Sequence, residues 1–149
     1  MRRTIDFYLG RFLVILMVLM TIDVLWGVFT RYALGSQASW SEELARFLLI
    51  WIGVLGAAYA SGQGMHLAID LMKKEQKSNL SLLINCLIIA FAFCVMIIGG
   101  GRLIYITNVL EQLSPALRLP MSVVYAVIPI SGLLIIYYKV SDLLQPTKV

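Results

Sequence analysis

The chain has 149 residues, of which 60% are hydrophobic and only 13% are charged. Soluble domains have roughly 45–50% apolar and about 25% charged residues, so this composition excludes an ordinary soluble globular protein. The formal net charge of +4 is small and dispersed, which argues against nucleic acid as a partner. We therefore expect a protein whose main surroundings are membrane lipids.

Long apolar runs predict an all-α integral membrane protein. A bilayer core of ~30 Å needs about 20 mostly apolar residues per helix. Four runs of this kind predict transmembrane helices over approximately 12–30, 42–62, 79–102 and 119–138, in a single four-helix membrane domain covering residues 1–149. The basic start resembles a signal peptide, but no small-residue cleavage site follows, so we expect an uncleaved helix. Pro129 predicts a kink in the last span, because proline removes a backbone donor.

Basic residues predict that the N- and C-termini are both cytoplasmic. The inner side would then hold eight basic residues, Arg2, Arg3, Arg11, Lys73, Lys74, Lys77, Lys139 and Lys148, against four outside, Arg31, Arg46, Arg102 and Arg118. After the second span comes "HLAIDLM", a short amphipathic segment that we expect at the inner membrane interface. Its His66 and Asp70 form an inner interfacial motif. A proton-relay role for His66 is the functional interpretation, and a structural hydrogen-bonding role is the favoured one.

The second span begins with charges, in the stretch "SWSEELARFLLIW" at residues 39–51. Ser39 and Glu42 have the spacing of a capping box, which predicts Ser39 as the N-cap. Glu42 and Arg46 are four residues apart with the acid first, the favourable order for an intrahelical pair. Trp40 fits the aromatic belt at a membrane interface. A helix starting at the outer membrane surface explains these features without any further function.

Asp23 and Arg46 are harder to explain in this way. A charge at mid-bilayer costs about 2.5–3.5 kcal/mol on insertion scales, so it usually faces protein. Asp23 precedes Arg31 by eight residues, roughly 12 Å along a helix. We therefore expect a polar cluster in the outer half of the bundle, which either joins the first two helices or faces another membrane protein. Its members would be Asp23, Arg31, Trp40, Glu42, Glu43 and Arg46.

The remaining patterns concern packing. Small residues at helical spacing, Gly53, Gly56, Ala57 and Ala60, favour packing inside this chain over a partner surface. "GGG" at 99–101 predicts a bend or a close contact. "VLEQLSPAL" predicts a brief surface helix interrupted by Pro115. Cys86 and Cys94 are over two helical turns apart, too far for a disulfide, and we expect both to act as small hydrophobes.

The order of these motifs resembles the small membrane subunit of the tripartite ATP-independent periplasmic (TRAP) transporters, the DctQ-like family. The resemblance rests on "FTRY", "WSEELARFLLIWIGVLGAAYA" and "GQGMHLAIDL", and covers residues 26–71. The matching positions are Arg31, Tyr32, Trp40, Glu42, Glu43, Ala45, Arg46, Trp51, Gly56, Ala57, His66 and Asp70. The last two spans match only in number and length.

The resemblance implies an accessory, non-enzymatic role in the bacterial inner membrane. In that family a periplasmic binding protein captures an organic acid, and a large membrane subunit carries the substrate and sodium sites. The small subunit packs against the fixed scaffold of the large one and helps to form the docking surface for the binding protein. The implied partners are these two proteins and membrane lipids, with no catalytic, metal or cofactor site in this chain. Some relatives are fused to the large subunit, and we expect this chain to be the separate form.

Two other classes of function remain open. An autonomous four-helix exporter would use Asp23 as its proton- or cation-binding acid. The clear charge bias argues against it, because exporters that insert in both orientations need a weak bias. A membrane-bound enzyme is the third class, and the sequence offers no nucleophile–base pair or metal set for it.

Overall fold

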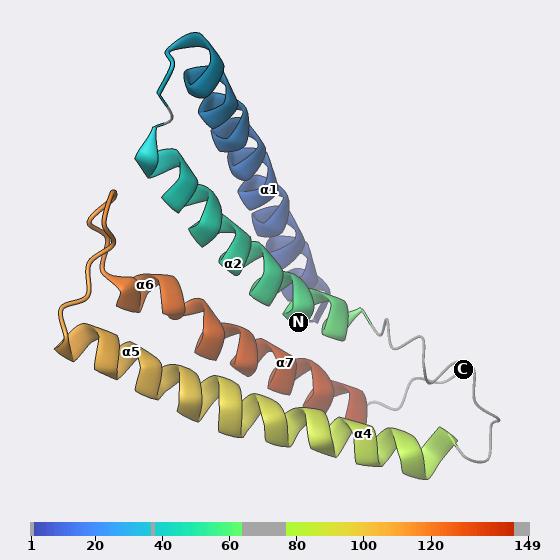
Figure 1. Cartoon of the computed structure of the whole chain (residues 1–149). Coiled ribbons are helices and arrows are strands. Elements are labelled where there is room, and N and C mark those ends of the chain that lie inside the picture. The colour runs from blue at the N-terminus through green and yellow to red at the C-terminus, as the bar shows by residue number, and fades with distance from the viewer. Residues whose placement is uncertain (1, 37, 64–76, 145–149) are drawn as a thin grey trace.

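The computed structural model describes residues 2–36, 38–63 and 77–144, and these residues form four long helices (Figure 1). The first two are α1 (Arg2–Ala33) and α2 (Ser39–Gly62). The third is continuous and consists of α4 (Lys77–Phe91), the π-helix η1 (Ala92–Gly99) and α5 (Gly100–Val109). The fourth consists of α6 (Met121–Tyr125) and α7 (Val127–Leu144). All four are long and apolar enough to cross a membrane, which confirms the all-α fold with four spans.

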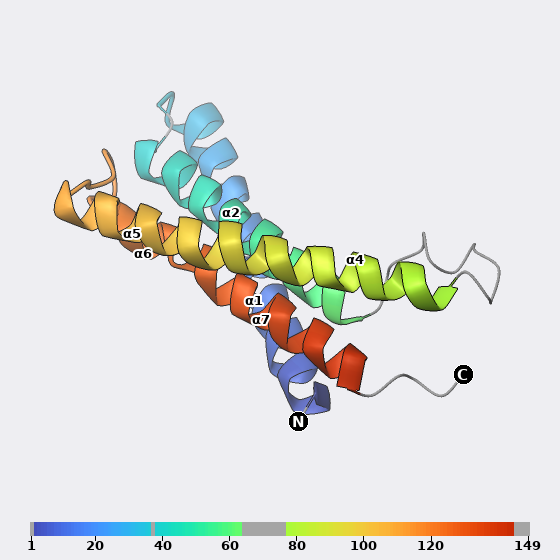
Figure 2. The ribbon, with the colours of Figure 1, turned by 90° about the horizontal axis from the view of Figure 1, so that it is seen from below.

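The helices pack as two antiparallel hairpins with α2 and α7 in the middle. Helix α2 contacts α1 on one side and α7 on the other, and α7 also packs against η1. The connections between α1 and α2 and between α5 and α6 lie at the same end of the molecule, which we call the loop end (Figures 1 and 2). Away from this end the two hairpins meet closely, and toward it α1 and α5 diverge.

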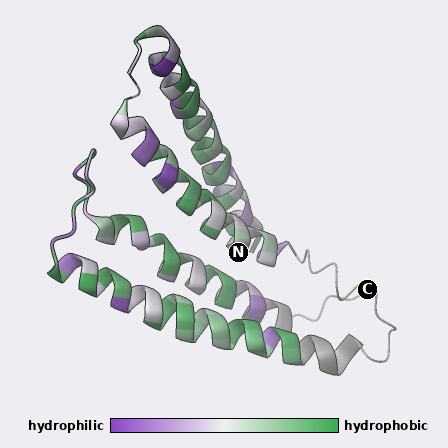
Figure 3. Ribbon diagram, in the orientation of Figure 1, coloured by the Kyte–Doolittle hydropathy of each residue, from purple (hydrophilic) through white to green (hydrophobic). Residues whose placement is uncertain are grey.

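The core follows the line where the hairpins meet. Its first cluster joins α1, α2 and α7 and consists of Leu13, Leu16, Leu55 and Val127. A second joins α2, η1 and α7 through Ala58, Ala92 and Ile135. Hydrophobic residues also make up most of α1 and of the third helix (Figure 3), and many of them are exposed. Such a surface suits lipid or another membrane protein, because apolar groups gain nothing by leaving a bilayer for the protein interior.

Glycines allow the third and fourth helices to approach closely. A Cβ built on Gly132 would lie 2.8 Å from the Cβ of Met96, and one built on Gly100 would lie 3.0 Å from Ile128 Cγ2. A Cβ on Gly101 would meet nothing within 4 Å. The "GGG" stretch therefore provides a close contact through its middle glycine.

Pro129 interrupts the fourth helix as predicted. Helix α6 ends at Tyr125 and α7 begins at Val127. Pro129 has no N–H to donate to the carbonyl of Tyr125, four residues earlier, so the regular ladder is broken there. Another boundary differs from its prediction, because the third helix continues beyond residue 102 to Val109. Arg102 is therefore an exposed residue on the flank of a helix and does not mark its end.

The predicted surface helix at 109–117 is wrong. The third helix ends in a Schellman motif, in which Gln112 N–H donates to Thr107 O and Glu111 N–H donates to Asn108 O, both at 3.1 Å. Glu111 adopts the left-handed conformation with φ of 46°. The chain then turns back, and Leu113 forms an antiparallel bridge with Pro120. Pro115 lacks the N–H that a continuing helix would need at that position.

The small-residue stripe of α2 also differs from its prediction. A Cβ on Gly53 or on Gly56 would meet nothing within 4 Å, and Ala57 is exposed. This stripe does not pack inside the chain. The two cysteines, by contrast, are both free and exposed, as expected of small hydrophobes on a lipid-facing surface.

The glycine contact between the third and fourth helices gives the first testable prediction. Replacing Gly132 by Ala should lower the melting temperature in detergent, because the added methyl group overlaps Met96 and overpacking costs about 1–3 kcal/mol. Gly101→Ala is the matched control, since its methyl group enters open space. Thermal unfolding followed by circular dichroism measures both, and equal melting temperatures would count against the close contact.

Candidate functional site

The six residues predicted to cluster all lie toward the loop end, but they do not form one closed group. Asp23 is buried and Glu43 is half-buried, whereas the other four side chains are exposed. Those four are Arg31, Trp40, Glu42 and Arg46. Within the residues that the structure describes, no ion pair or hydrogen bond joins any of the six side chains to another. They must therefore be considered one by one.

The start of α2 differs from the predicted capping box. The N-cap is Ala38, whose backbone is extended, and no side chain caps the helix. Ser39 is already the first helical residue, so its side chain is not placed to cap. Glu42 lies in the first turn, where its charge opposes the positive end of the helix dipole. The predicted pair between Glu42 and Arg46 is not formed, and both residues are exposed.

Ser41 is the residue that fastens α2 to α1. Its buried hydroxyl donates to the backbone carbonyl of Asp23 at 3.0 Å. A Cβ on Gly27 would lie 3.0 Å from this hydroxyl oxygen, so the glycine leaves room for the contact. This role of Ser41 is not predicted from the sequence, because a serine in a first helical turn looks like a local capping residue. The available signal was a glycine in the facing helix.

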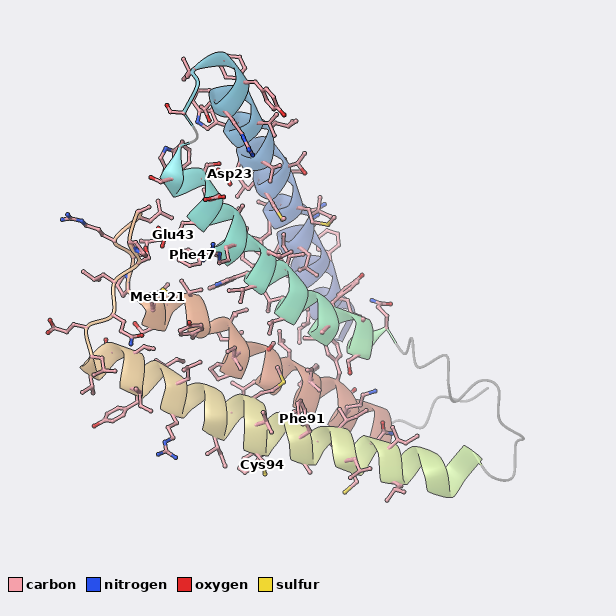
Figure 4. All side chains as sticks on the ribbon, viewed as in Figure 1. Asp23, Glu43, Phe47, Phe91, Cys94 and Met121 are labelled. Atoms are coloured by element: carbon pink, nitrogen blue, oxygen red, sulfur yellow. The ribbon has the colours of Figure 1, made fainter. Side chains whose placement is uncertain are left out.

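Asp23 lies between α1 and α2 near the loop end (Figure 4). Its side chain is 6% exposed, and neither carboxylate oxygen has a hydrogen-bond partner among the described residues. Asp23 contributes to the wall of a cavity of about 370 Å³, although its carboxylate oxygens are inaccessible. The other lining residues are apolar or aromatic, namely Leu19, Ile22, Trp26, Trp40, Leu44 and Leu48. Of the predicted cluster, the structure thus brings only Asp23 and Trp40 to a common cavity.

The Glu43 carboxylate accepts hydrogen bonds from the loop between α5 and α6, near which it lies (Figure 4). One carboxylate oxygen, Oε2, accepts from the backbone N–H of Ala116 at 2.9 Å and from that of Leu117 at 2.7 Å. These two amides are consecutive donors in a turn whose Arg118 N–H donates to Ser114 O at 3.1 Å. A charged acceptor makes stronger hydrogen bonds than a neutral one. Glu43 therefore joins the first hairpin to the second at the loop end.

The opposite end of the molecule carries a second polar contact. The hydroxyl of Tyr138 donates to Asp6 Oδ1 at 2.6 Å, which links α7 to α1. The Tyr138 ring packs over Gly62, where an added Cβ would lie 2.8 Å from three ring atoms. The neighbouring Lys139 is 1% exposed. From the sequence Lys139 is expected on the cytoplasmic side, and its burial is not predicted. The predicted inner motif, His66 and Asp70, lies outside the described residues.

The side of α2 that faces away from the core is uncovered. Its exposed residues recur at helical spacing, with charges near the loop end and small residues further along. We call this surface the α2 open face, and it consists of the exposed residues Glu42, Arg46, Leu49, Gly53 and Ala57 with the half-buried Gly56. The buried residues Phe47, Leu55 and Ala58 occupy the other side of the helix. Among the described residues, no group of three or more His, Cys, Asp or Glu side chains is placed to hold a metal ion.

The role of Glu43 can be tested by hydrogen exchange. Glu43→Gln should accelerate exchange at the amides of Ala116 and Leu117 about fivefold, because hydrogen bonds to a charged acceptor are worth roughly 1 kcal/mol more than neutral ones. Glu42→Gln is the control, since its side chain accepts no hydrogen bond from the loop. Unchanged protection of both amides in Glu43→Gln would contradict the attachment.

Comparison with known proteins places the chain in a family. Residues 20–148 match the model of the tripartite ATP-independent periplasmic transporters, DctQ component. The chain is 27% identical over 141 residues to a protein of Haemophilus influenzae assigned as a TRAP transporter small permease. That alignment covers 91% of this chain and 87% of the relative.

Two further relatives are longer than this chain. The C4-dicarboxylate TRAP transporter small permease protein DctQ of Rhodobacter capsulatus is 28% identical, over 69% of this chain and 47% of the relative. The isethionate TRAP transporter permease protein DctMQ of Oleidesulfovibrio alaskensis is 27% identical, over 77% of this chain and 19% of the relative. Small permeases of this kind work with a large membrane subunit, consistent with the much longer DctMQ chain. The four-helix membrane protein described above therefore belongs to the DctQ family and is a small permease subunit of TRAP transporters.

Proposed function

We propose that this chain scaffolds the large membrane subunit of a TRAP transporter in the bacterial inner membrane and helps to dock the periplasmic binding protein. The system would take up an organic acid with sodium. Substrate and sodium would bind to the large subunit, and this chain would carry no cofactor and catalyse no reaction. The α2 open face is the observation that carries the proposal.

The open face has the properties of a contact surface between membrane helices. Gly53 and Gly56 leave space within 4 Å of their Cβ positions, and small residues let a second helix approach closely. Arg46 lies two turns inside the helix and is exposed, without an ion pair in the described part of the chain. A lipid-facing arginine is costly at such depth unless it reaches the interface, whereas an acidic or polar partner residue compensates it. A large-subunit helix on this face would pack closely against the two glycines and would supply a polar partner for Arg46.

The loop end suits the docking role. If both termini are cytoplasmic, as the distribution of Lys and Arg predicts, the loop end faces the periplasm. The turn that contains Ala116 and Leu117 is then held in place there by Glu43. The exposed charges of Glu111 and Arg118 lie on the same loop, where a soluble binding protein can reach them. A loop fixed by hydrogen bonds loses less conformational entropy on docking than a free one.

The exporter remains a second candidate because of one observation, the buried and unpartnered carboxylate of Asp23. An acid of this kind inside a membrane helix is a functional site by default. The two candidates make opposite predictions for the purified chain. Cation-driven transport by this chain alone in proteoliposomes would support the exporter and contradict the subunit.

Reversing one charge on the open face tests the subunit role. Glu42→Lys should reduce co-purification with the large subunit and organic-acid uptake severalfold, because it places like charges four residues apart and opposes the helix dipole. Glu111→Lys makes the same charge change at the same end, on the α5–α6 loop, and should leave co-purification unchanged. Equal yields of the complex for the wild type and Glu42→Lys would remove this face from the interface.

A further inference from the structure

The Asp23 carboxyl group is buried at a cost that nothing in the described chain offsets. Both oxygens are inaccessible and have no hydrogen-bond partner. Burying a charge without a partner is unfavourable, and a neutral carboxyl without a partner still loses its hydrogen bonds to water. Ser41 contacts the backbone carbonyl of Asp23 and not its side chain. Among the described residues, the Asp23 side chain therefore lacks the partner that a buried carboxyl group normally has.

The nearby arginines of this chain do not pair with the Asp23 carboxyl group. Arg31 and Arg46, the arginines of α1 and α2 toward the loop end, are both exposed and form no ion pair within the part of the chain that the structure describes. The cavity beside Asp23 is instead open to an outside group. Its rim residues Trp26 and Trp40 are 47% and 41% exposed, so the space between them is reachable from the surface of the hairpin.

We infer that this cavity is a socket for a lysine or arginine side chain of the large membrane subunit, and that the Asp23 carboxylate, which is shielded in the free chain, turns toward the cavity to pair with it. The inference rests on the proposed function. The cavity of about 370 Å³ has room for such a side chain, and its walls are apolar apart from Asp23. Lys and Arg combine a long aliphatic stem with a charged head, which matches apolar walls around a single carboxylate.

The aromatic rim supports a cation. Trp26 and Trp40 contribute to the walls from α1 and α2, and the ring of an indole attracts a cation placed over its face. Depth in the membrane favours a protein side chain over a lipid amine. Asp23 lies roughly 12 Å before Arg31 along α1, well inside the span Thr4–Ala33, whereas lipid headgroups lie at the ends of the span.

The socket and the α2 open face lie on different sides of α2. The cavity uses Trp40, Leu44 and Leu48, and the open face uses Glu42, Arg46 and Gly53. The large subunit would therefore contact this chain at two separate places. The charged contact at the cavity and the close packing at the α2 open face can therefore be tested independently.

The experiment uses the full chain co-expressed with its large subunit. The readouts are the affinity of the two purified subunits in nanodiscs and organic-acid uptake. Asp23→Asn and Asp23→Leu should each weaken assembly at least tenfold, because either change leaves the incoming cation without its partner. Asp23→Glu keeps the charge and should retain most of the affinity. Thr21→Asn, an exposed position on α1, is the matched control and should behave like the wild type.

A charge-reversal pair identifies the partner side chain. Asp23→Arg should abolish assembly, and a library of acidic substitutions at the basic residues of the large subunit should contain one that restores it. Wild-type affinity of Asp23→Asn and Asp23→Leu would overturn the socket alone. So would a lower melting temperature of Asp23→Asn in the isolated chain, which would indicate a role inside this subunit, or dependence of assembly on amine-bearing lipids. If the wild-type chains do not assemble at all, the proposed function itself is overturned.

Discussion

The structure depends on helix α2, because it is the element that contacts both α1 and α7. In a bilayer, apolar burial adds little to the association of helices, so close packing and hydrogen bonds must hold them. Helix α2 provides these through small residues on its inner side. Ser41 bonds to α1 beside Gly27, Ala58 is fully buried beside η1 and α7, and Gly62 receives the ring of Tyr138.

Polar contacts fix the two hairpins at both ends. At the loop end, Glu43 of α2 accepts two backbone hydrogen bonds from the second hairpin. At the other end, Asp6 of α1 accepts one from Tyr138 of α7. The apolar clusters between these ends determine how closely the helices lie, whereas the polar contacts determine their register. The proposed docking role would need such a register, since a docking surface that keeps its shape without the partner loses less conformational entropy on binding.

The sequence predicts the features that depend on local composition. The apolar runs correspond to the four spans, and Pro129 marks the break between α6 and α7. It does not predict contacts between residues distant in the chain. Ser39 has a local capping pattern, but the serine that matters is Ser41, whose partner is in α1. Likewise "VLEQLSPAL" has helical periodicity, but the left-handed Glu111 and the bonds to Glu43 fold it as a loop.

In the candidate site, too, the sequence predicts local features but not the contacts between distant residues. Charges near the loop end were evident from the sequence, but their different surroundings were not. Glu43 is satisfied within the chain, Asp23 is buried without a partner, and Arg46 is exposed inside a membrane span. A protein that works alone in a membrane gains nothing from the last two arrangements, since each leaves a polar group uncompensated. The proposed assembly would explain both, because the large subunit would supply the missing cation on one side of α2 and cover the arginine on the other.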